Sequence, residues 1–433
     1  MKNSGVEWIG EIPENWEVKK VKHSFVRKNE KAMQENPIVL SLARSGVKER
    51  DISNNEGQLA ESYYNYNPVD VDDLLINPMD LYSGANCSIS KVKGVISPAY
   101  INLRAKKNVS PVFYDYYFKV QYWMMAFFAH GNGVSFENRW TLNNETLQNY
   151  PIVAPSFETQ QRIASYLDKK CSKIEETIQN QQQVIEKLKA YKQSLITEAV
   201  TGKIKIQNGK VCGKYQSYKD SGVEYLGKIP LDWNIKRLRY IGKCQNGISK
   251  GGEFFGSGYP FVSYGDVYNN LILPETVSGL IESTPEEQEN YSVMAGDIFF
   301  TRTSETIEEV GFTSVCLKTI EKATFAGFVI RVRPFTEELV PDYSKYYFSS
   351  DAHRRFFVKE MNLVTRASLS QDLLKRLPVL IPSKEKQKEI ADYLDKKCTA
   401  IDTAIEQKQN LIEKLTEYKK SLIYECVTGK KEI

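Results

Sequence analysis

The sequence predicts an α+β protein: two mixed α/β heads on a frame of two long antiparallel coiled-coil helices, arranged as a pseudo-two-fold tandem repeat. One stretch occurs twice, at 151–206 and 378–433, and the copies align without a gap with about 31 of 56 positions identical. Each copy has apolar residues at alternating steps of four and three over more than four heptads. This spacing is typical of a coiled coil.

The apolar seam of each copy predicts which residues pair the helices. Gly202 and Gly429 follow the seams, where a C-terminal glycine ends a helix. Two matched helices in one chain most simply pair with each other, and antiparallel pairing would place Gln181 and Lys408 close together near the seam midpoint. A polar contact there would fix the register. The residues expected to pair the helices are Leu167, Ile174, Ile178, Ile185, Leu188, Leu195, Leu394, Ile401, Ile405, Ile412, Leu415 and Leu422.

A second repeat relates 1–22 to 218–239, and each copy carries a Pro-x-x-Trp motif. We expect Trp16 and Trp233 to be core anchors beside a turn that leads into a strand. The chain therefore divides into a first head, a long helix, a linker, a second head and another long helix. The expected boundaries are 1–150, 151–206, 207–217, 218–377 and 378–433.

The heads barely resemble each other, although the segments 139–142 and 366–369 align near their ends. In the first head, the pattern predicts strands at 38–42, 74–76 and 100–103, and one helix that starts at Ser110–Pro111 and runs through an aromatic band to about residue 131. We interpret that band as core packing. In the second head, it predicts strands at 260–264, 297–301, 314–317 and 327–332, and a helix after Pro341.

Composition excludes several classes of protein. The formal net charge is only +4, and acidic and basic side chains balance within 1–150 and within 207–377, so charge alone does not suggest DNA binding. No apolar run approaches the length of a membrane span, and the first residues do not read as a signal peptide. Seven cysteines without a Cys-x-x-Cys are expected to be reduced thiols, which indicates a cytoplasmic protein.

The sequence contains no recognisable catalytic motif. It lacks a phosphate-binding glycine loop and a methyl-donor loop, and its three histidines have no metal-ligand spacing. Asp168-x-Lys170 and Asp395-x-Lys397 superficially resemble nuclease pairs, but we interpret them as solvated helix charges. We therefore expect neither an active site nor a metal in this chain.

Several motifs together carry a specific resemblance. They are the twin Pro-x-x-Trp motifs, PSFETQQRIASYLD and PSKEKQKEIADYLD at the starts of the long helices, their Val-Thr-Gly-Lys ends, and Ala295-Gly-Asp-Ile-Phe-Phe-Thr-Arg-Thr-Ser304. With these, the chain resembles the DNA-specificity subunit of a type I restriction–modification enzyme over nearly its whole length. In the first head, 71–74 is only a faint echo of 295–298.

The resemblance implies a non-catalytic subunit whose heads are target recognition domains, each reading half of a split sequence in double-stranded DNA. It also implies two modification subunits that methylate adenine with S-adenosylmethionine, and restriction subunits that use ATP and Mg²⁺. From the residues alone, two alternatives stay open: a coiled-coil scaffold whose heads bind proteins, and a stand-alone nuclease. A steep fall of DNA affinity with salt would favour DNA recognition over the scaffold.

Base readout needs polar or basic side chains on exposed loops. For any one residue, a structural role inside its domain is an equally good interpretation. The expected DNA-binding residues are Lys250, Tyr264, Arg302, Ser304, Arg366 and Ser368 in the second head, and Ser41, Arg44, Arg139 and Thr141 in the first.

Overall fold

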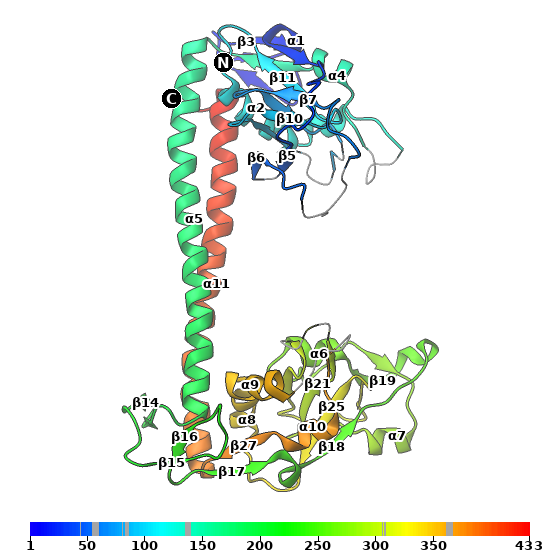
Figure 1. Cartoon of the computed structure of the whole chain (residues 1–433), viewed down its shortest axis with the longest axis vertical. Coiled ribbons are helices and arrows are strands. Elements are labelled where there is room, and N and C mark those ends of the chain that lie inside the picture. Colours follow the sequence, from blue (N-terminus) through cyan, green and yellow to red (C-terminus); the bar gives the residue numbers. More distant parts are fainter. Residues whose placement is uncertain are drawn as a thin grey trace. The chain divides into compact units, whose positions relative to one another are not determined.

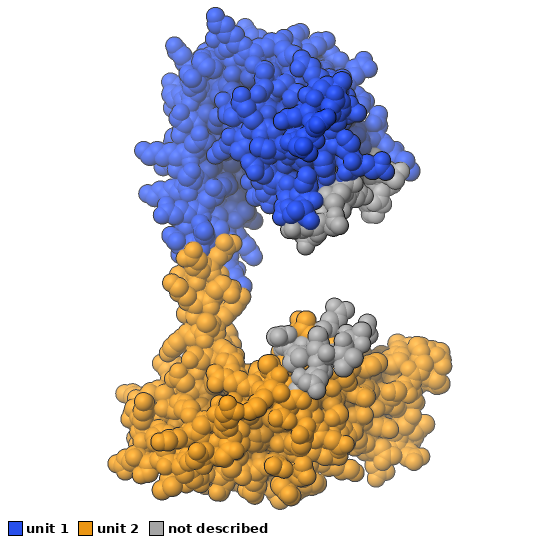
Figure 2. Space-filling model, in the orientation of Figure 1, with its two compact units in different colours: residues 1–181, 409–433 blue, residues 182–408 orange. Residues whose placement is uncertain are grey.

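The computed structural model describes residues 1–43, 45–53, 60–79, 81–82, 86–134, 140–304, 306, 309–360 and 367–433. The chain divides into two compact units (Figure 2). Unit 1 comprises residues 1–181 and 409–433, and unit 2 comprises residues 182–408. Each unit contains one head with parts of both long helices.

The frame consists of helices α5 (Phe157–Val200) and α11 (Lys384–Val427), each 44 residues long (Figure 1). In unit 1 the start of α5 shares a core with the end of α11, and Lys419 pairs with Glu175. In unit 2 the end of α5 shares a core with the start of α11, and Lys192 Nζ lies 2.6 Å from Asp402 Oδ2. Pairing is therefore antiparallel in both units, as the sequence predicts.

None of the residues predicted to pair the helices is exposed. Gln181 and Lys408 are also half-buried, but their predicted mutual contact stays a prediction. The buried members are Leu167, Ile185, Leu195, Leu394, Ile401 and Leu422, and the half-buried ones are Ile174, Ile178, Leu188, Ile405, Ile412 and Leu415.

The first head is built around a four-stranded antiparallel sheet in the order β4-β11-β8-β9. A buried aromatic cluster from α2 packs on it, which confirms the aromatic band as core. The elements are β1 (Lys2–Asn3), β2 (Glu11–Ile12), β3 (Glu17–Lys20), α1 (Val21–Ser24), β4 (Phe25–Lys28), β5 (Leu40–Ala43), β6 (Gly46–Glu49), β7 (Asn67–Val69), β8 (Leu74–Ile76), β9 (Cys87–Ile89), β10 (Gly94–Ile96), β11 (Ile101–Ala105), α2 (Pro111–Trp123), α3 (Ala126–Ala129), α4 (Asn144–Asn149) and β12 (Pro151–Ala154).

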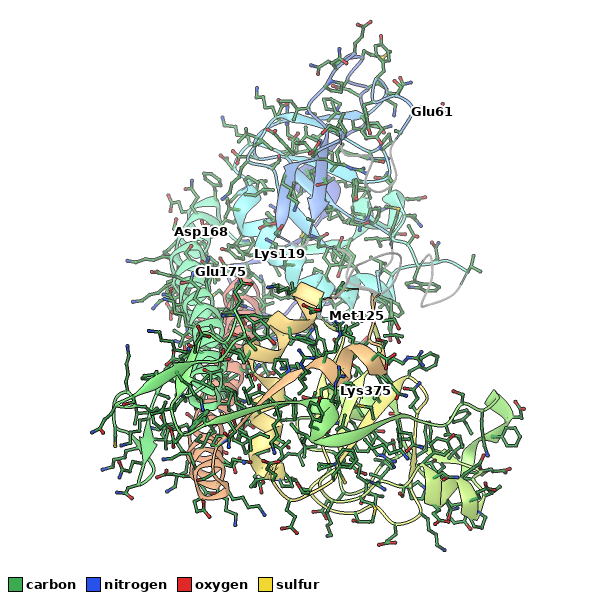
Figure 3. All side chains as sticks on the ribbon, turned by 60° about the horizontal axis from the view of Figure 1, so that its bottom comes forward. Glu61, Lys119, Met125, Asp168, Glu175 and Lys375 are labelled. Carbon is green, nitrogen blue, oxygen red and sulfur yellow. The ribbon has the colours of Figure 1, made fainter. Side chains whose placement is uncertain are left out.

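The single aromatic helix predicted here is wrong in one respect. It begins at Pro111 with Ser110 as its cap, as predicted, but α2 ends at Trp123. Met125, labelled in Figure 3, adopts the left-handed conformation with φ of 58°, and a separate helix, α3, starts at Ala126. Periodicity could not reveal this break, because the residues on both sides of it are apolar.

The second head repeats the sheet in the order β18-β25-β21-β23. Its predicted strands exist, with bounds shifted by a few residues. The elements are β15 (Tyr218–Asp220), β16 (Lys228–Pro230), β17 (Asn234–Arg237), η1 (Leu238–Tyr240), β18 (Gly242–Asn246), η2 (Gly252–Phe254), β19 (Phe255–Val262), α6 (Tyr264–Asn269), β20 (Leu280–Ile281), α7 (Pro285–Asn290), β21 (Ile298–Thr301), β22 (Thr303–Ser304), β23 (Thr313–Val315), β24 (Thr324–Phe325), β25 (Val329–Pro334), α8 (Pro341–Ser349), α9 (Asp351–Glu360), β26 (Ala367–Ser368), α10 (Gln371–Arg376) and β27 (Pro378–Ile381).

The segment predicted as a linker has structure of its own. Strands β13 (Ile206–Gln207) and β14 (Lys210–Val211) form a hairpin. The hairpin is attached to α11, because Lys386 Nζ donates to the carbonyl of Ile206 and the amide of Asn208 donates to Glu389. Its anchor, Ile206, is fully buried.

The two Pro-x-x-Trp motifs pack on the ends of the long helices. Trp16 and Trp233 are buried, as predicted for core anchors. Trp16 and Pro13 lie against Gly429 at the end of α11, while Trp233 and Pro230 lie against Gly202 at the end of α5. Each helix end is therefore covered by the motif that opens one of the heads.

All seven cysteines are free thiols. Among the described residues, no helix is both long and apolar enough to cross a membrane.

Candidate nucleic-acid interface

A buried aspartate stands at the same point of the sheet in both heads. Asp73 precedes β8 and its Oδ2 accepts from the amide of Asp70 at 2.8 Å. Asp297 precedes β21 and its Oδ2 accepts from the amide of Met294, also at 2.8 Å. Residues 71–74, whose sequence resembles 295–298 only faintly, are thus structurally equivalent to them, because the same backbone turn leads into the same central strand in both heads.

An arginine on the neighbouring strand completes this equivalence. Arg104 Nε on β11 donates to Asp73 Oδ1 at 2.8 Å, and Arg333 Nε on β25 donates to Asp297 Oδ1 at 2.7 Å. Both aspartates are 1% exposed, so these ion pairs hold the sheet together and do not face a ligand.

The segments that the sequence aligned near the ends of the heads return to equivalent places. The amide of Leu142 donates to the carbonyl of Pro78, which follows β8 by two residues. The amide of Leu369 donates to the carbonyl of Arg302 just beyond β21. In each head, a segment from the end of the domain therefore joins the end of the central strand.

In the second head this junction collects most of the predicted DNA-binding residues. Strand β22 pairs with β26, so Thr303 lies opposite Ser368. Tyr264, at the start of α6, donates from its hydroxyl to the carbonyl of Thr303 at 2.8 Å, and Ser304 Oγ donates to Glu309 Oε2 at 2.9 Å. Arg302 is half-exposed, and no hydrogen bond or ion pair of its side chain occurs within the described part of the chain. Arg366 lies outside the described residues.

Lys250 does not join this group. Its Nζ lies 2.7 Å from Glu287 Oε2 and donates to the carbonyl of Glu282, and it sits over the ring of Phe254. The Lys250 side chain is 16% exposed, and its charge is already neutralised. The structure therefore favours an intradomain role for Lys250.

The first head holds its predicted residues on two neighbouring segments. Ser41 lies on the β5–β6 hairpin, whose Ala43 carbonyl accepts from Asn86 Nδ2 at 2.6 Å. The carbonyl of Asn86 in turn accepts from the amide of Asn77, the residue that follows β8. Thr141 lies in the segment that returns to the end of β8, and it forms an isolated antiparallel β-bridge with Asn132. Arg44 and Arg139 lie outside the described residues.

Sequence reasoning missed a shallow hollow beside α6 in the second head. It has a volume of about 220 Å³, and its lining includes Asn269, Asn270 and Arg354. Tyr268 on the same helix stacks with Tyr264, which links the hollow to the β22–β26 junction. Asparagine and arginine are the residues that read adenine and guanine edges. Only the position of Asn269–Asn270 after a predicted strand could have indicated them.

The two aspartates that resemble nuclease residues have a different role from the one expected. Each contacts a tyrosine of a head: Tyr116 donates to Asp168 at 2.8 Å, and Tyr346 donates to Asp395 at 2.6 Å. They are therefore not merely solvated helix charges. Over the described ranges, no group of three or more histidine, cysteine, aspartate or glutamate side chains is placed to hold a metal ion.

Solved structures share the fold of this chain. One chain from a study of complex assembly and conformational transition of the type I R-M system matches with a TM-score of 0.73 at 14% identity, over 97% of this chain and 100% of that one. The HsdS subunit from Thermoanaerobacter tengcongensis matches with a TM-score of 0.53 at 14% identity, over 97% and 98% of the two chains. These matches establish a shared fold.

Sequence relatives then give the family. The model of the type I restriction modification DNA specificity domain matches residues 13–190 and 230–415. The chain is 22% identical to the type I restriction enzyme EcoBI specificity subunit of Escherichia coli over 86% of this chain and 76% of that protein. It is 23% identical to the MjaVIII specificity subunit of Methanocaldococcus jannaschii over 83% and 80%. The chain belongs to the type I restriction–modification DNA specificity family, and its function is recognition of a DNA target.

Proposed function

We propose that the chain reads a bipartite DNA sequence, with residues 1–150 and 218–377 as target recognition domains for one half-site each. The observation that carries this proposal is the repeated junction at the end of the central strand. In both heads a returning segment meets that strand end beside polar side chains. Two similar reading surfaces on paired antiparallel helices suit two half-sites of one duplex.

The chain itself would be non-catalytic and cytoplasmic. It would position two modification subunits that methylate adenine, together with restriction subunits in the full complex. Its relatives are specificity subunits by name, which supports this division of labour. It is also supported by the buried aspartates Asp73 and Asp297, because each is paired with an arginine of its own head.

Within the second head, we assign base or phosphate contact to Tyr264, Arg302, Ser304 and Ser368. The strongest member is Arg302, because it is half-exposed at the junction and its guanidinium group has no hydrogen-bond or ion-pair partner among the described residues. An arginine in bidentate contact with a guanine contributes about 1–3 kcal/mol of discrimination. Lys250 is not part of this assignment, since Glu287 already neutralises it.

The test compares two variants that each remove one positive charge from the same head. Arg302→Ala should lower affinity for the target duplex about 5- to 100-fold and relax preference at one base position. Lys250→Ala should leave affinity nearly unchanged, because its charge is already paired. Binding is measured by titration at several salt concentrations, after methylome sequencing has defined the target. Equal losses in both variants would contradict the assignment, and affinity insensitive to salt would contradict DNA recognition itself.

A further inference from the structure

Two polar contacts between a head and its long helix recur in both copies. The first is a buried glutamine near the helix start: Gln160 Oε1 accepts from the amide of Ser110 at 2.8 Å, and Gln387 Oε1 accepts from the amide of Val340 at 2.8 Å. Because the head contributes only a backbone N–H group, this contact is compatible with a head of almost any sequence.

The second contact lies two turns further along each helix. It is the tyrosine–aspartate hydrogen bond, Tyr116 to Asp168 and Tyr346 to Asp395. Eight residues separate the glutamine from the aspartate in both copies, about 12 Å along the axis. Each tyrosine is the sixth residue of its helix, α2 or α8, counted from Pro111 or Pro341. Two heads with little sequence in common therefore present the same hydroxyl to the same helix position.

The tyrosine–aspartate hydrogen bond can fix the orientation of the head on its helix, but it adds little to the stability of the fold. The Asp168 side chain is exposed, so water competes for it. The surrounding contacts of Leu167 and Cys171 are apolar and non-directional. A hydrogen bond 12 Å from the glutamine contact, by contrast, limits rotation of the head about that first contact.

We propose that Tyr116–Asp168 and Tyr346–Asp395 are positioning contacts that fix the direction in which each head leaves its helix, and so narrow the spacings between half-sites that the chain accepts. This inference rests on the proposed reading of a bipartite target.

The two copies differ in the charged residue that precedes the tyrosine. In unit 2, Lys345 Nζ also contacts Asp395 Oδ1 at 2.7 Å, and Lys345 is 4% exposed. The equivalent residue in unit 1 is Asp115, which pairs with Lys119 at 2.6 Å and repels Asp168. Figure 3 shows Asp168 and Glu175 following each other along α5, with Lys119 of α2 nearby. The contact in unit 1 therefore depends on the tyrosine hydroxyl, whereas in unit 2 the ion pair of Lys345 also holds Asp395.

The experiment measures methylation by the chain in complex with modification subunits from its source cell. Substrates are duplexes with both half-sites at the native spacing, or with one base pair more or fewer. The readout is the ratio of rates on altered and native spacing. Tyr116→Phe should raise this ratio about three- to tenfold, because the variant loses the free energy of one hydrogen bond that favours the native spacing. Tyr346→Phe should raise it less, because Lys345 still holds Asp395, and adding Lys345→Met should bring it to the Tyr116→Phe value.

Controls separate positioning from stability. Tyr418→Phe on exposed α11 surface should leave the ratio unchanged. Asp168→Asn keeps an oxygen acceptor and should retain the narrow spacing, while Asp168→Ala should lose it. Thermal melting identifies any variant whose fold is weakened. A ratio unchanged in Tyr116→Phe, in Asp168→Ala and in a variant that combines Tyr116→Phe with Tyr346→Phe would overturn the positioning role alone. A wild-type complex that ignores spacing would overturn the bipartite target as well, and so distinguishes the two failures.

Discussion

The glycines at the ends of the long helices should be required for packing as well as for backbone conformation. Gly429 has φ of +73°, and a Cβ there would lie 2.6 Å from Pro13 Cγ and 3.1 Å from Trp16 Cη2. Gly202 has φ of +70° with Pro230 Cγ at 2.5 Å. Gly10, in the repeated segment 1–22 that also contains Trp16, has a φ of +70° as Gly202 does, but nothing lies within 4 Å of its Cβ position. These positions form a matched comparison.

The expected magnitudes follow from that geometry. Alanine in the left-handed region costs about 1–2 kcal/mol at any of these sites. At Gly429 and Gly202 the added methyl group must also displace proline and tryptophan, which costs about 1–3 kcal/mol more. Gly10→Ala carries only the first cost. With about 2–4 °C per kcal/mol for domains of this size, the difference in Tm should be about 2–12 °C.

The assay is thermal melting of the three single variants beside the wild type, followed by tryptophan fluorescence. Gly429→Ala should also expose Trp16 to solvent, because the indole loses its contact with the helix end. If Gly429→Ala and Gly10→Ala melted at the same temperature, the helix ends would need glycine only for conformation, and the packing role would be wrong.

Three further predictions concern specificity and pH. Replacing residues 23–150 with the first head of another family member should change one half-site only in the methylome, and a change in both would contradict separate reading. Inserting one heptad into each helix near the seam midpoint adds about 10 Å, so the non-specific spacer should lengthen by about three base pairs, with some loss of activity. An active variant with the original spacer would refute this. Burial and the neighbouring Arg354 lower the pKa of His353 to about 3, so the histidine is neutral in the fold but protonated below about pH 6.5 when unfolded. Stability should therefore fall by about 1 kcal/mol per pH unit below 6.5, and His353→Gln should melt with a weaker dependence between pH 7 and 5.

The sequence by itself determined the repeated frame. Heptad spacing is local information, and the seam residues from Leu167 to Leu422 are buried or half-buried as that spacing requires. The glycines after each seam and the tryptophan anchors could also be predicted, because each belongs to a pattern of residues that are close together in the sequence. The strands of both sheets could be placed approximately for the same reason.

Only the tertiary structure decided which polar residues meet. Ser368 joins Thr303 across 65 positions of sequence, Tyr116 reaches Asp168 across 52, and Lys250 is neutralised by Glu287 across 37. A side chain's availability for DNA depends on such distant partners, and no local pattern specifies them. The equivalence of the two heads was hidden likewise, because a shared sheet requires only apolar strands and a buried aspartate–arginine pair, which different sequences can supply.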